Sequence, residues 1–255
     1  MRIGLYVIGD ELLSGKRQDK HLANVTELLK ARGLQLSWVK FLGDELQLLV
    51  NEFRNSLSAG DLVFSCGGIG ATPDDLTRHA VADALGIQLE LHAGGLHILE
   101  SIAENFDGGL TEQRKRMVEF PVGASLIPNP INKIPGFSIN HHYFVPGFPK
   151  MAQPMIQWVL ENHYANLSND DYVEWSVKLF EVPESHIADL METMQQHYAV
   201  KAFSLPKFVD DGYQVELGLK GKQQDVSEAK EELMKNLKPV SYTHLTLPTM
   251  STTCG

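Results

Sequence analysis

The sequence predicts an α/β protein: a three-layer α/β/α domain with a mostly parallel sheet, followed by a small α+β domain. In the first part of the chain, short apolar runs typical of buried strands alternate with segments whose apolar residues recur at helical spacing. Strands separated by helices pair in parallel, with helices on both faces of the sheet. After about residue 170 the order becomes strand, helix, strand, strand, helix. That order is typical of a small sandwich with helices on one face of a mixed sheet.

Short apolar runs mark the strands of the first domain. Ile3–Ile8 is predicted as a buried first strand, Leu34–Leu42 as the second and Asp61–Cys66 as the third. The later part of the domain is less regular, and we expect short strands at Ser125–Ile127 and His142–Val145.

Capping residues and apolar periodicity mark the helices between these strands. The first helix is expected to begin after Asp19, a capping residue, and to end before Gly33. The second ends at Gly60 and carries apolar residues at helical spacing: Leu46, Leu49, Val50, Phe53 and Leu57. A third follows the third strand. Further helices are predicted near Ala93–Asn105 and at Pro149–His163, where the first domain closes.

A polar stretch, 166–171, separates a domain at 1–165 from a second at 170–238. The elements expected in the second domain are a strand at Tyr172–Val182, a helix at Glu184–His197, strands at Val200–Leu205 and Tyr213–Leu219, and a helix at Asp225–Leu237. The last segment, 241–255, has no charged side chain apart from histidine and is crowded with Thr and Ser. We interpret it as a non-native or disordered tail and leave it out of the fold.

Composition argues against several classes of function. The chain has 22 Lys and Arg against 32 Asp and Glu, a formal net charge of −10, which disfavours binding to a nucleic-acid backbone. The two cysteines, Cys66 and Cys254, do not make a disulfide framework. No apolar stretch approaches the ~20 residues of a membrane helix. We therefore expect a cytoplasmic protein that binds neither nucleic acid nor membrane.

A glycine-rich loop joins the third strand to the next helix. Three of its first four residues are glycines, Gly67, Gly68 and Gly70. Glycines let a ligand lie against the main chain, and the N–H groups of a helix capped by Thr72 or Asp74 suit a phosphate. Asp75 brings a carboxylate to the same region. An acid beside a phosphate requires a cation between them, so a divalent metal such as Mg²⁺ is expected. Alternatively, the loop is a plain turn in which Asp74 or Asp75 only caps the helix.

Two further loops carry acids. The loop after the first strand contains Gly9, Asp10, Glu11, Ser14 and Gly15. Asp44 and Glu45 follow the second strand. Loops after parallel strands leave from the C-terminal edge of the sheet, where ligands bind. We therefore expect three acid-bearing loops at one edge, although each acid taken alone could serve as a helix cap.

Four motifs together resemble a known family. They are IGDELLSG (8–15), GGIGATPDDLT (67–77), Asn129-Pro130 with Pro135-Gly136-Phe137, and PGFP (146–149). Their order and spacing, over roughly residues 1–165, are similar to the molybdenum-cofactor-biosynthesis (MoCF, molybdopterin-binding) domain. The branch is the one that forms the N-terminal part of competence/damage-inducible protein A (CinA). The unit at about 170–238 is similar to the small middle domain of that branch.

The resemblance implies roles for individual residues. It implies that the three loop glycines cradle the phosphate of the ligand, and that Asp75 is the catalytic or metal-linked acid with Asp44 as its partner. Pro146 and Gly147 would form a turn that faces the ligand. Members of this branch are associated with ADP-ribose hydrolysis, and the wider family adenylylates molybdopterin. Relatives also suggest a homo-oligomer.

Both reactions need a phosphate cradle, a metal and carboxylates that hold it. We therefore expect a divalent-metal-dependent hydrolase acting on a pyrophosphate bond of a nucleotide such as ADP-ribose, with Asp75, Asp44 and Asp10 available to hold Mg²⁺. The alternatives are a non-catalytic molybdopterin or nucleotide binding protein, and a molybdopterin adenylyltransferase-like enzyme. A pterin and a dinucleotide both present phosphate to the same loop, so both ligands stay open.

Overall fold

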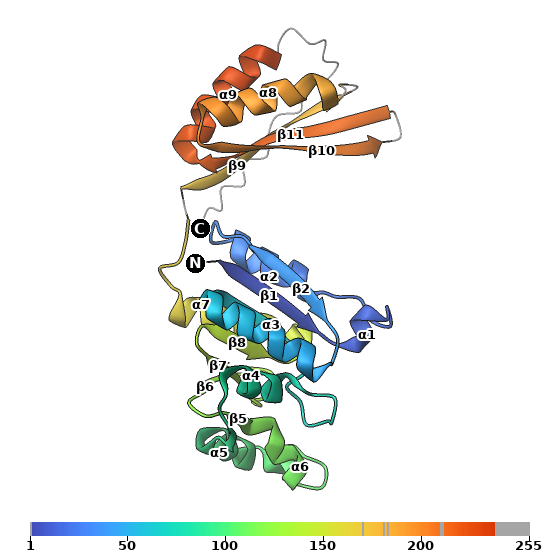
Figure 1. Cartoon of the computed structure of the whole chain (residues 1–255), viewed down its shortest axis with the longest axis vertical. Helices are drawn as coiled ribbons and strands as arrows, with labels where there is room; N and C mark the ends of the chain where they lie inside the picture. The colour runs from blue at the N-terminus through green and yellow to red at the C-terminus, as the bar shows by residue number, and fades with distance from the viewer. Residues whose placement is uncertain (1, 170, 181, 183, 210–211, 238–255) are drawn as a thin grey trace. The chain divides into compact units, whose positions relative to one another are not determined.

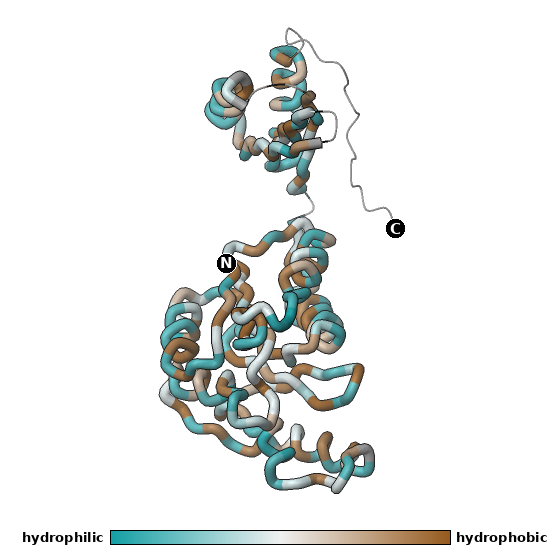
Figure 2. The backbone as a smooth tube through the Cα atoms, turned by 90° about the vertical axis from the view of Figure 1, so that its right-hand side faces the viewer, coloured by the Kyte–Doolittle hydropathy of each residue, from teal (hydrophilic) through white to brown (hydrophobic). Residues whose placement is uncertain are grey.

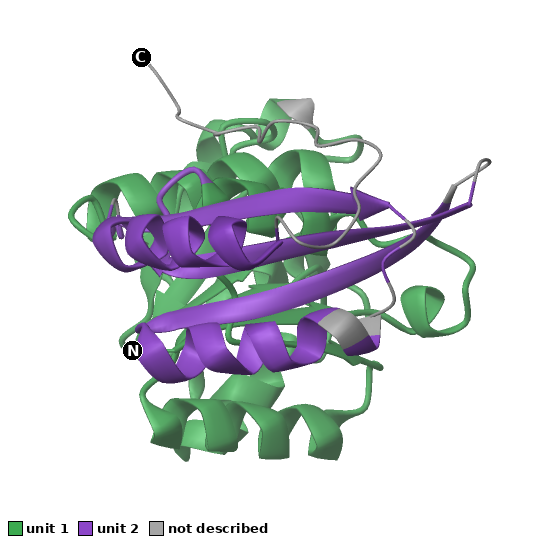
Figure 3. Cartoon of the chain, turned by 90° about the horizontal axis from the view of Figure 1, so that it is seen from above, with its two compact units in different colours: residues 1–30, 34–167 green, residues 31–33, 168–255 purple. Residues whose placement is uncertain are grey.

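A computed structural model describes residues 2–169, 171–180, 182, 184–209 and 212–237. The chain divides into two compact units, which Figure 3 colours separately. Unit 1 comprises residues 1–30 and 34–167, and unit 2 comprises residues 31–33 and 168–255. Segment 241–255, which we interpret as a tail, lies outside the described residues. No helix in the described ranges is both long and apolar enough to cross a membrane.

Six strands form the central sheet of unit 1, in the order β2-β1-β3-β8-β7-β6 (Figure 1). The strands are β1 (Ile3–Ile8), β2 (Trp38–Leu42), β3 (Leu62–Cys66), β6 (Ser125–Ile127), β7 (Gly136–Ile139) and β8 (His142–Val145). The first four in spatial order are parallel, and β7 runs antiparallel to both of its neighbours. The predicted mostly parallel sheet is confirmed. A separate antiparallel pair joins β4 (Leu89–Leu91) to β5 (Glu119–Pro121).

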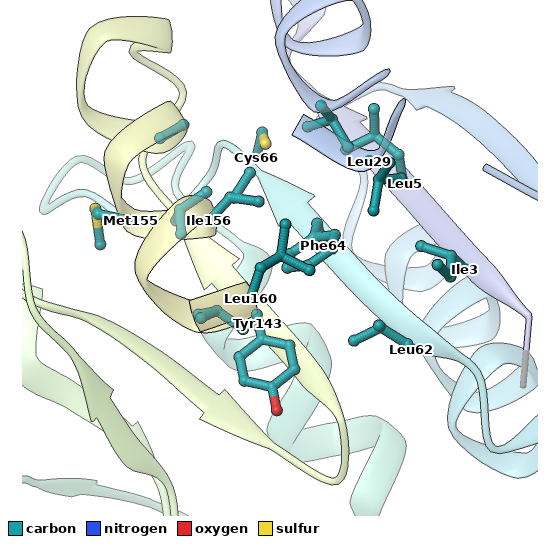
Figure 4. Packing of buried hydrophobic residues seen from close by; sticks show 14 of the residues in the cluster. Ile3, Leu5, Leu29, Leu62, Phe64, Cys66, Tyr143, Met155, Ile156 and Leu160 are labelled. Atoms are coloured by element: carbon teal, nitrogen blue, oxygen red, sulfur yellow. The ribbon is translucent and has the colours of Figure 1, made fainter. Parts of the chain in front are cut away.

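Helices cover both faces of this sheet, because side chains alternate along each strand. Ile3, Leu5 and Val7 of β1 lie in one core cluster with α2 (His21–Lys30) and α7 (Pro149–His163), part of which Figure 4 shows. Tyr6 and Ile8 lie in the opposite cluster. That cluster includes residues of α3 (Leu46–Ala59), α4 (Thr77–Leu85) and α5 (Ala93–Ser101). The short elements α1 (Asp10–Leu13), η1 (Ala103–Asn105), α6 (Glu112–Lys115) and η2 (Arg116–Val118) complete the unit.

Two helix ends follow the sequence signals closely. The carboxylate of Asp19 accepts the N–H groups of His21 and Leu22 at 2.8 and 3.0 Å and so caps α2. Gly60 has φ 66°, a left-handed conformation, and its N–H bonds to the carbonyl of Leu57 at the end of α3. Both predicted boundaries are confirmed. Figure 2 shows hydrophilic and hydrophobic residues alternating along the helices, as expected for helices that pack one face against a core.

The described residues of unit 2 form a three-stranded sheet with two helices. Its elements are β9 (Tyr172–Phe180), α8 (Glu184–His197), β10 (Val200–Val209), β11 (Gly212–Lys222) and α9 (Gln223–Leu237). The predicted order of elements is confirmed. The expected mixed sheet is wrong, because β11 lies between β10 and β9 and is antiparallel to both. Leu179 and Leu217 of the sheet pack with Met194 of α8 and Leu233 of α9 in a core of the unit's own.

Candidate functional site

Four loops leave the same edge of the unit 1 sheet, because the strands that precede them are parallel neighbours. They are residues 9–15, 43–45, 67–76 and 146–148. Backbone hydrogen bonds of 3.0 Å join Gly9 N–H to the carbonyl of Leu42, and Gly67 N–H to the carbonyl of Val145. The loops therefore lie side by side along one edge.

Asp10 and Asp44 bind each other across two of these loops. The carboxylate of Asp44 accepts the backbone N–H of Asp10 at 3.0 Å, and the carboxylate of Asp10 accepts that of Asp44 at 3.2 Å. The accepting atoms are Oδ1 of Asp10 and Oδ2 of Asp44. The other oxygen of each carboxylate has no hydrogen-bond partner among the described residues. The alternative that these two acids cap helices is wrong. The N-cap positions of α1 and α3 are Gly9 and Glu45, and neither makes a side-chain capping bond.

This acid pair lies in a field of negative charge. Burial raises the pKa of the Asp44 carboxyl above its usual value, and the charges of Asp10, Glu11 and Asp74 raise it further. The bond from the Asp10 amide acts in the opposite direction. Acids of the two other loops thus act on the Asp44 carboxylate, and a bound cation would relieve their repulsion.

Asp75 is the centre of the glycine-rich loop. Its Oδ1 accepts the N–H of Gly70 at 2.8 Å, and its Oδ2 accepts both the N–H of Thr72 at 2.8 Å and the Thr72 hydroxyl at 2.5 Å. An ionised carboxylate offers about four acceptor positions. Three are therefore used inside the loop, and one on Oδ1 is left for a ligand or a cation.

Helix α4 begins without a side-chain cap, so the expected capping by Thr72 or Asp74 is wrong. Its N-cap position is Leu76, and Asp75, the other capping candidate, bonds within the loop instead. The first turn is held by the loop itself. Thr77 donates its backbone N–H to the carbonyl of Gly68 and its hydroxyl to that of Gly67, each at 3.0 Å.

The loop glycines are required by close packing. Gly67 and Gly68 have φ 113° and 68°, and a Cβ atom on Gly68 would collide with the hydroxyl of Thr77. Among the hydrogen bonds of the described residues, none uses the N–H groups of Gly68, Ile69 or Ala71. Three backbone donors of one short loop thus have no partner among the described residues, and backbone donors of this kind suit an anion.

The turn at Pro146 and Gly147 packs against this loop. A Cβ on Gly147 would lie 3.3 Å from Cα of Gly67. His21, at the start of α2, is 4% exposed and donates Nε2–H to the carbonyl of Gly147 at 3.3 Å. Burial lowers the pKa of His21, which favours the neutral ring. Sequence reasoning missed His21, and its position on the apolar face of a helix was the only available signal.

The other residues of the predicted first loop bond to nearby residues of the same segment. Glu11 pairs with Arg17 at 3.7 Å, and the backbone N–H of Ser14 bonds to the carbonyl of Asp10. Gly15 is exposed, with φ 73°. Among the described residues, no hydrogen bond or ion pair joins Ser14 or Gly15 to the glycine-rich loop.

A cavity of about 480 Å³ adjoins the same loop at Ala71. Phe106, Arg114, Met117 and Ile134 contribute to its lining. The guanidinium of Arg114 lies 5.0 Å from the centre of the Phe106 ring and donates to the carbonyl of Asp107 at 2.6 Å. The cavity thus offers aromatic and apolar surface beside the free amides.

The described residues contain no ready-made cluster of three or more His, Cys, Asp or Glu side chains for a metal ion. The donor chemistry still fits Mg²⁺, which commonly binds one or two carboxylates and takes its remaining ligands from phosphate and water. Asp10 and Asp44 each offer one oxygen without a partner. They therefore fit a partly hydrated ion better than Asp75 does, and the metal stays a prediction.

Comparison with known proteins identifies the family. The family described as probable molybdopterin binding domain matches residues 4–165, more than half of the chain. The chain belongs to this molybdopterin-binding-domain family. Its resemblance to the CinA N-terminal branch is confirmed by relatives and by a solved structure.

Three relatives of this molybdopterin-binding-domain chain differ in how much of their own length it covers. A CinA-like protein of Citrifermentans bemidjiense is 31% identical over 75% of this chain and 47% of its own length, so the chain spans about half of that relative. A protein of Caldivirga maquilingensis is 28% identical over 94% of this chain and 98% of its own length. The crystal structure of the protein CinA from Thermoplasma acidophilum, 26% identical, matches with a TM-score of 0.57 over 64% of this chain and 98% of that one.

Proposed function

We propose that this molybdopterin-binding-domain protein is a divalent-metal-dependent hydrolase that cleaves a pyrophosphate bond in a nucleotide such as ADP-ribose. One observation carries the proposal. Free amides of Gly68, Ile69 and Ala71 follow β3, and the paired carboxylates of Asp10 and Asp44 follow β1 and β2, the next two strands on one side of it, along the same sheet edge. Backbone donors suit phosphate oxygens, and carboxylates suit the cation that accompanies them.

Each group has a distinct part in this reaction. The loop amides would bind and orient one phosphate of the pyrophosphate, and Asp75 would hold the loop in shape through its three hydrogen bonds. The unpartnered oxygens of Asp10 and Asp44 would hold Mg²⁺, which supplies electrostatic stabilisation of the charge that develops on phosphate. The cavity beside Ala71 has space for a further part of the ligand.

The test is to incubate the full chain with Mg²⁺ and ADP-ribose and to identify the products. Hydrolysis of the pyrophosphate bond yields AMP and ribose 5-phosphate. Asp44→Asn retains an oxygen that can accept the Asp10 amide but removes the charge, so turnover should fall by roughly 10²-fold or more. Glu45→Gln is the matched control, since it neutralises the adjacent exposed acid, and it should leave turnover close to that of wild type.

A binding protein without turnover is the second candidate. Two observations favour this candidate. The carboxylate of Asp75 is engaged in three hydrogen bonds within its own loop, and the described residues contain no three-acid cluster for a metal. Wild-type binding of ADP-ribose without products would support it. Adenylylated product from molybdopterin and ATP would instead indicate the adenylyltransferase-like alternative. If neither ligand binds, the proposal is wrong.

A further inference from the structure

Arg78, the second residue of α4, is a buried cation with incomplete pairing. Its side chain is 2% exposed, and Nη2 donates to the carbonyl of Gly70 at 2.5 Å. Four buried side-chain polar atoms of the described residues lack a hydrogen-bond partner, and two of these are Nε and Nη1 of Arg78. Buried donors are normally paired, since an unpaired one is destabilising. The position therefore calls for an explanation other than stability.

The surroundings of Arg78 leave its charge only partly balanced. Burial lowers the pKa of its guanidinium, Asp75 and Glu119 raise it, and Arg116 lowers it. Arginine stays protonated in proteins even so. Among the described residues, no ion pair joins Arg78 to a carboxylate, and both oxygens of Asp75 accept hydrogen bonds of the loop. A positive charge is thus fixed against the glycine-rich loop.

The contact with Gly70 also orients a loop amide. The Gly70–Ala71 peptide is trans, so its carbonyl and the N–H of Ala71 point in opposite directions. Because Arg78 holds the carbonyl, the N–H of Ala71 is directed away from Arg78. One side of this peptide therefore carries a fixed cation and the other side a free donor.

An anion on this loop would face acids on the neighbouring loops. Asp10, Asp44 and Asp74 all carry negative charge at this sheet edge, and the charges of Asp10 and Asp74 reach Asp44 strongly enough to raise its pKa. Arg78 supplies charge of the opposite sign beside the Gly70–Ala71 peptide, whose N–H is one of the three free amides. Within a weakly polar interior such a charge acts more strongly than it would in water.

We propose that Arg78 is a positioning residue whose buried charge, held on the Gly70 carbonyl, sets the affinity of the loop for a phosphate group. The inference rests on the proposed function in one respect, namely that the amides of Gly68, Ile69 and Ala71 are the phosphate site. The ligand chemistry it specifies is a phosphate or pyrophosphate anion, bound even without a divalent metal.

The test is the binding of inorganic pyrophosphate to the full chain, without metal, at two salt concentrations. Arg78→Met should weaken binding roughly 10-fold or more and reduce its dependence on salt, because a charge-assisted interaction is lost. Arg78→Lys keeps the charge and should restore most of the affinity. The melting temperature of ligand-free Arg78→Met should be no lower than that of wild type, since an incompletely paired buried charge is removed.

Arg116→Gln is the matched control. It removes an exposed cation whose charge also reaches Arg78, and it should change affinity much less. If wild type fails to bind pyrophosphate, the phosphate site itself is wrong. If wild type binds and Arg78→Met binds equally well, only the role of Arg78 is overturned. The role of Arg78 is also overturned if Arg116→Gln weakens binding as much as Arg78→Met does. The same holds if Arg78→Met has a lower melting temperature than wild type and Arg78→Lys fails to restore binding.

Discussion

His142, at the start of β8, links the stability of unit 1 to pH. Its ring is fully buried, Nδ1–H donates to the carbonyl of Asn140 at 3.0 Å, and Nε2 lies 2.8 Å from the hydroxyl of Ser56. Burial lowers its pKa from 6.5 to about 4. The unfolded chain therefore binds more protons than the folded chain between these values, and the free energy of unfolding should fall as pH drops from about 6.5 towards 4.

The expected loss is roughly 3 kcal/mol across that window. Urea denaturation of wild type at a series of pH values measures it. His142→Gln should be less stable at neutral pH and should lose much less stability on acidification. His79→Gln, which changes an exposed histidine on α4, should retain the wild-type pH profile. An equal slope for His142→Gln and wild type would show that other groups control the effect.

The carboxylate of Asp75 holds the glycine-rich loop in shape by accepting hydrogen bonds from its backbone. Asp75→Asn keeps the size of the side chain, but its NH₂ group would replace an oxygen that now accepts the N–H of Gly70 or Thr72. We expect the free energy of unfolding to fall by about 1–3 kcal/mol, the effect of leaving a donor unpaired. Pyrophosphate affinity should fall even without metal.

Calorimetry with pyrophosphate, with and without Mg²⁺, checks this expectation. Asp74→Asn is the control: it neutralises an adjacent exposed acid without changing the bonds to the N–H groups of Gly70 and Thr72, so it should lower neither stability nor pyrophosphate affinity. Normal stability and metal-free affinity in Asp75→Asn, together with lost turnover, would instead assign Asp75 to the metal or to the chemistry.

At the scale of elements, periodicity and capping located most of unit 1. The predicted bounds of β1, β6 and α7 agree with the structure, because an apolar run or a helical stripe with a clear end marks each. Strand β2 is shorter than predicted. Trp38 pairs with Gly4 near the start of β1, so the residues before Trp38 have almost no partner strand to extend along. Strands β4, β5 and β7 were missed because each is short and contains Glu, Pro or Gly, which obscures the apolar run.

The gathering of the acid-bearing loops at one sheet edge was predictable, but their internal bonding was not. Parallel order alone brings the loops after β1, β2, β3 and β8 to one edge. The reciprocal bonds of Asp10 and Asp44, and the closure of the loop by Asp75, depend on loop geometry that residue types do not specify. Arg78 had no sequence signal, because arginine on a helix is usually exposed.

At the scale of the whole molecule, each unit has a hydrophobic core of its own. A chain truncated after residue 167 should therefore fold, and it should bind pyrophosphate because every group of the proposed site lies in unit 1. Circular dichroism and binding measurements on residues 1–167 and on the full chain check this. A truncated chain that folds but no longer binds would show that unit 2 contributes to the site.

The parallel arrangement of the sheet also has a consequence for folding kinetics. In an antiparallel hairpin, the paired strands are close together in the sequence. Here β1 pairs with β3, and β3 pairs with β8, across long stretches of intervening chain. Pairings of such long range slow folding, because loop-closure entropy is lost before the contacts compensate for it. During synthesis, the Pro146–Gly147 turn emerges long after Asp10. The Pro146–Gly147 side of the proposed ligand site, which packs against Gly67, is therefore among the last parts of unit 1 to assemble.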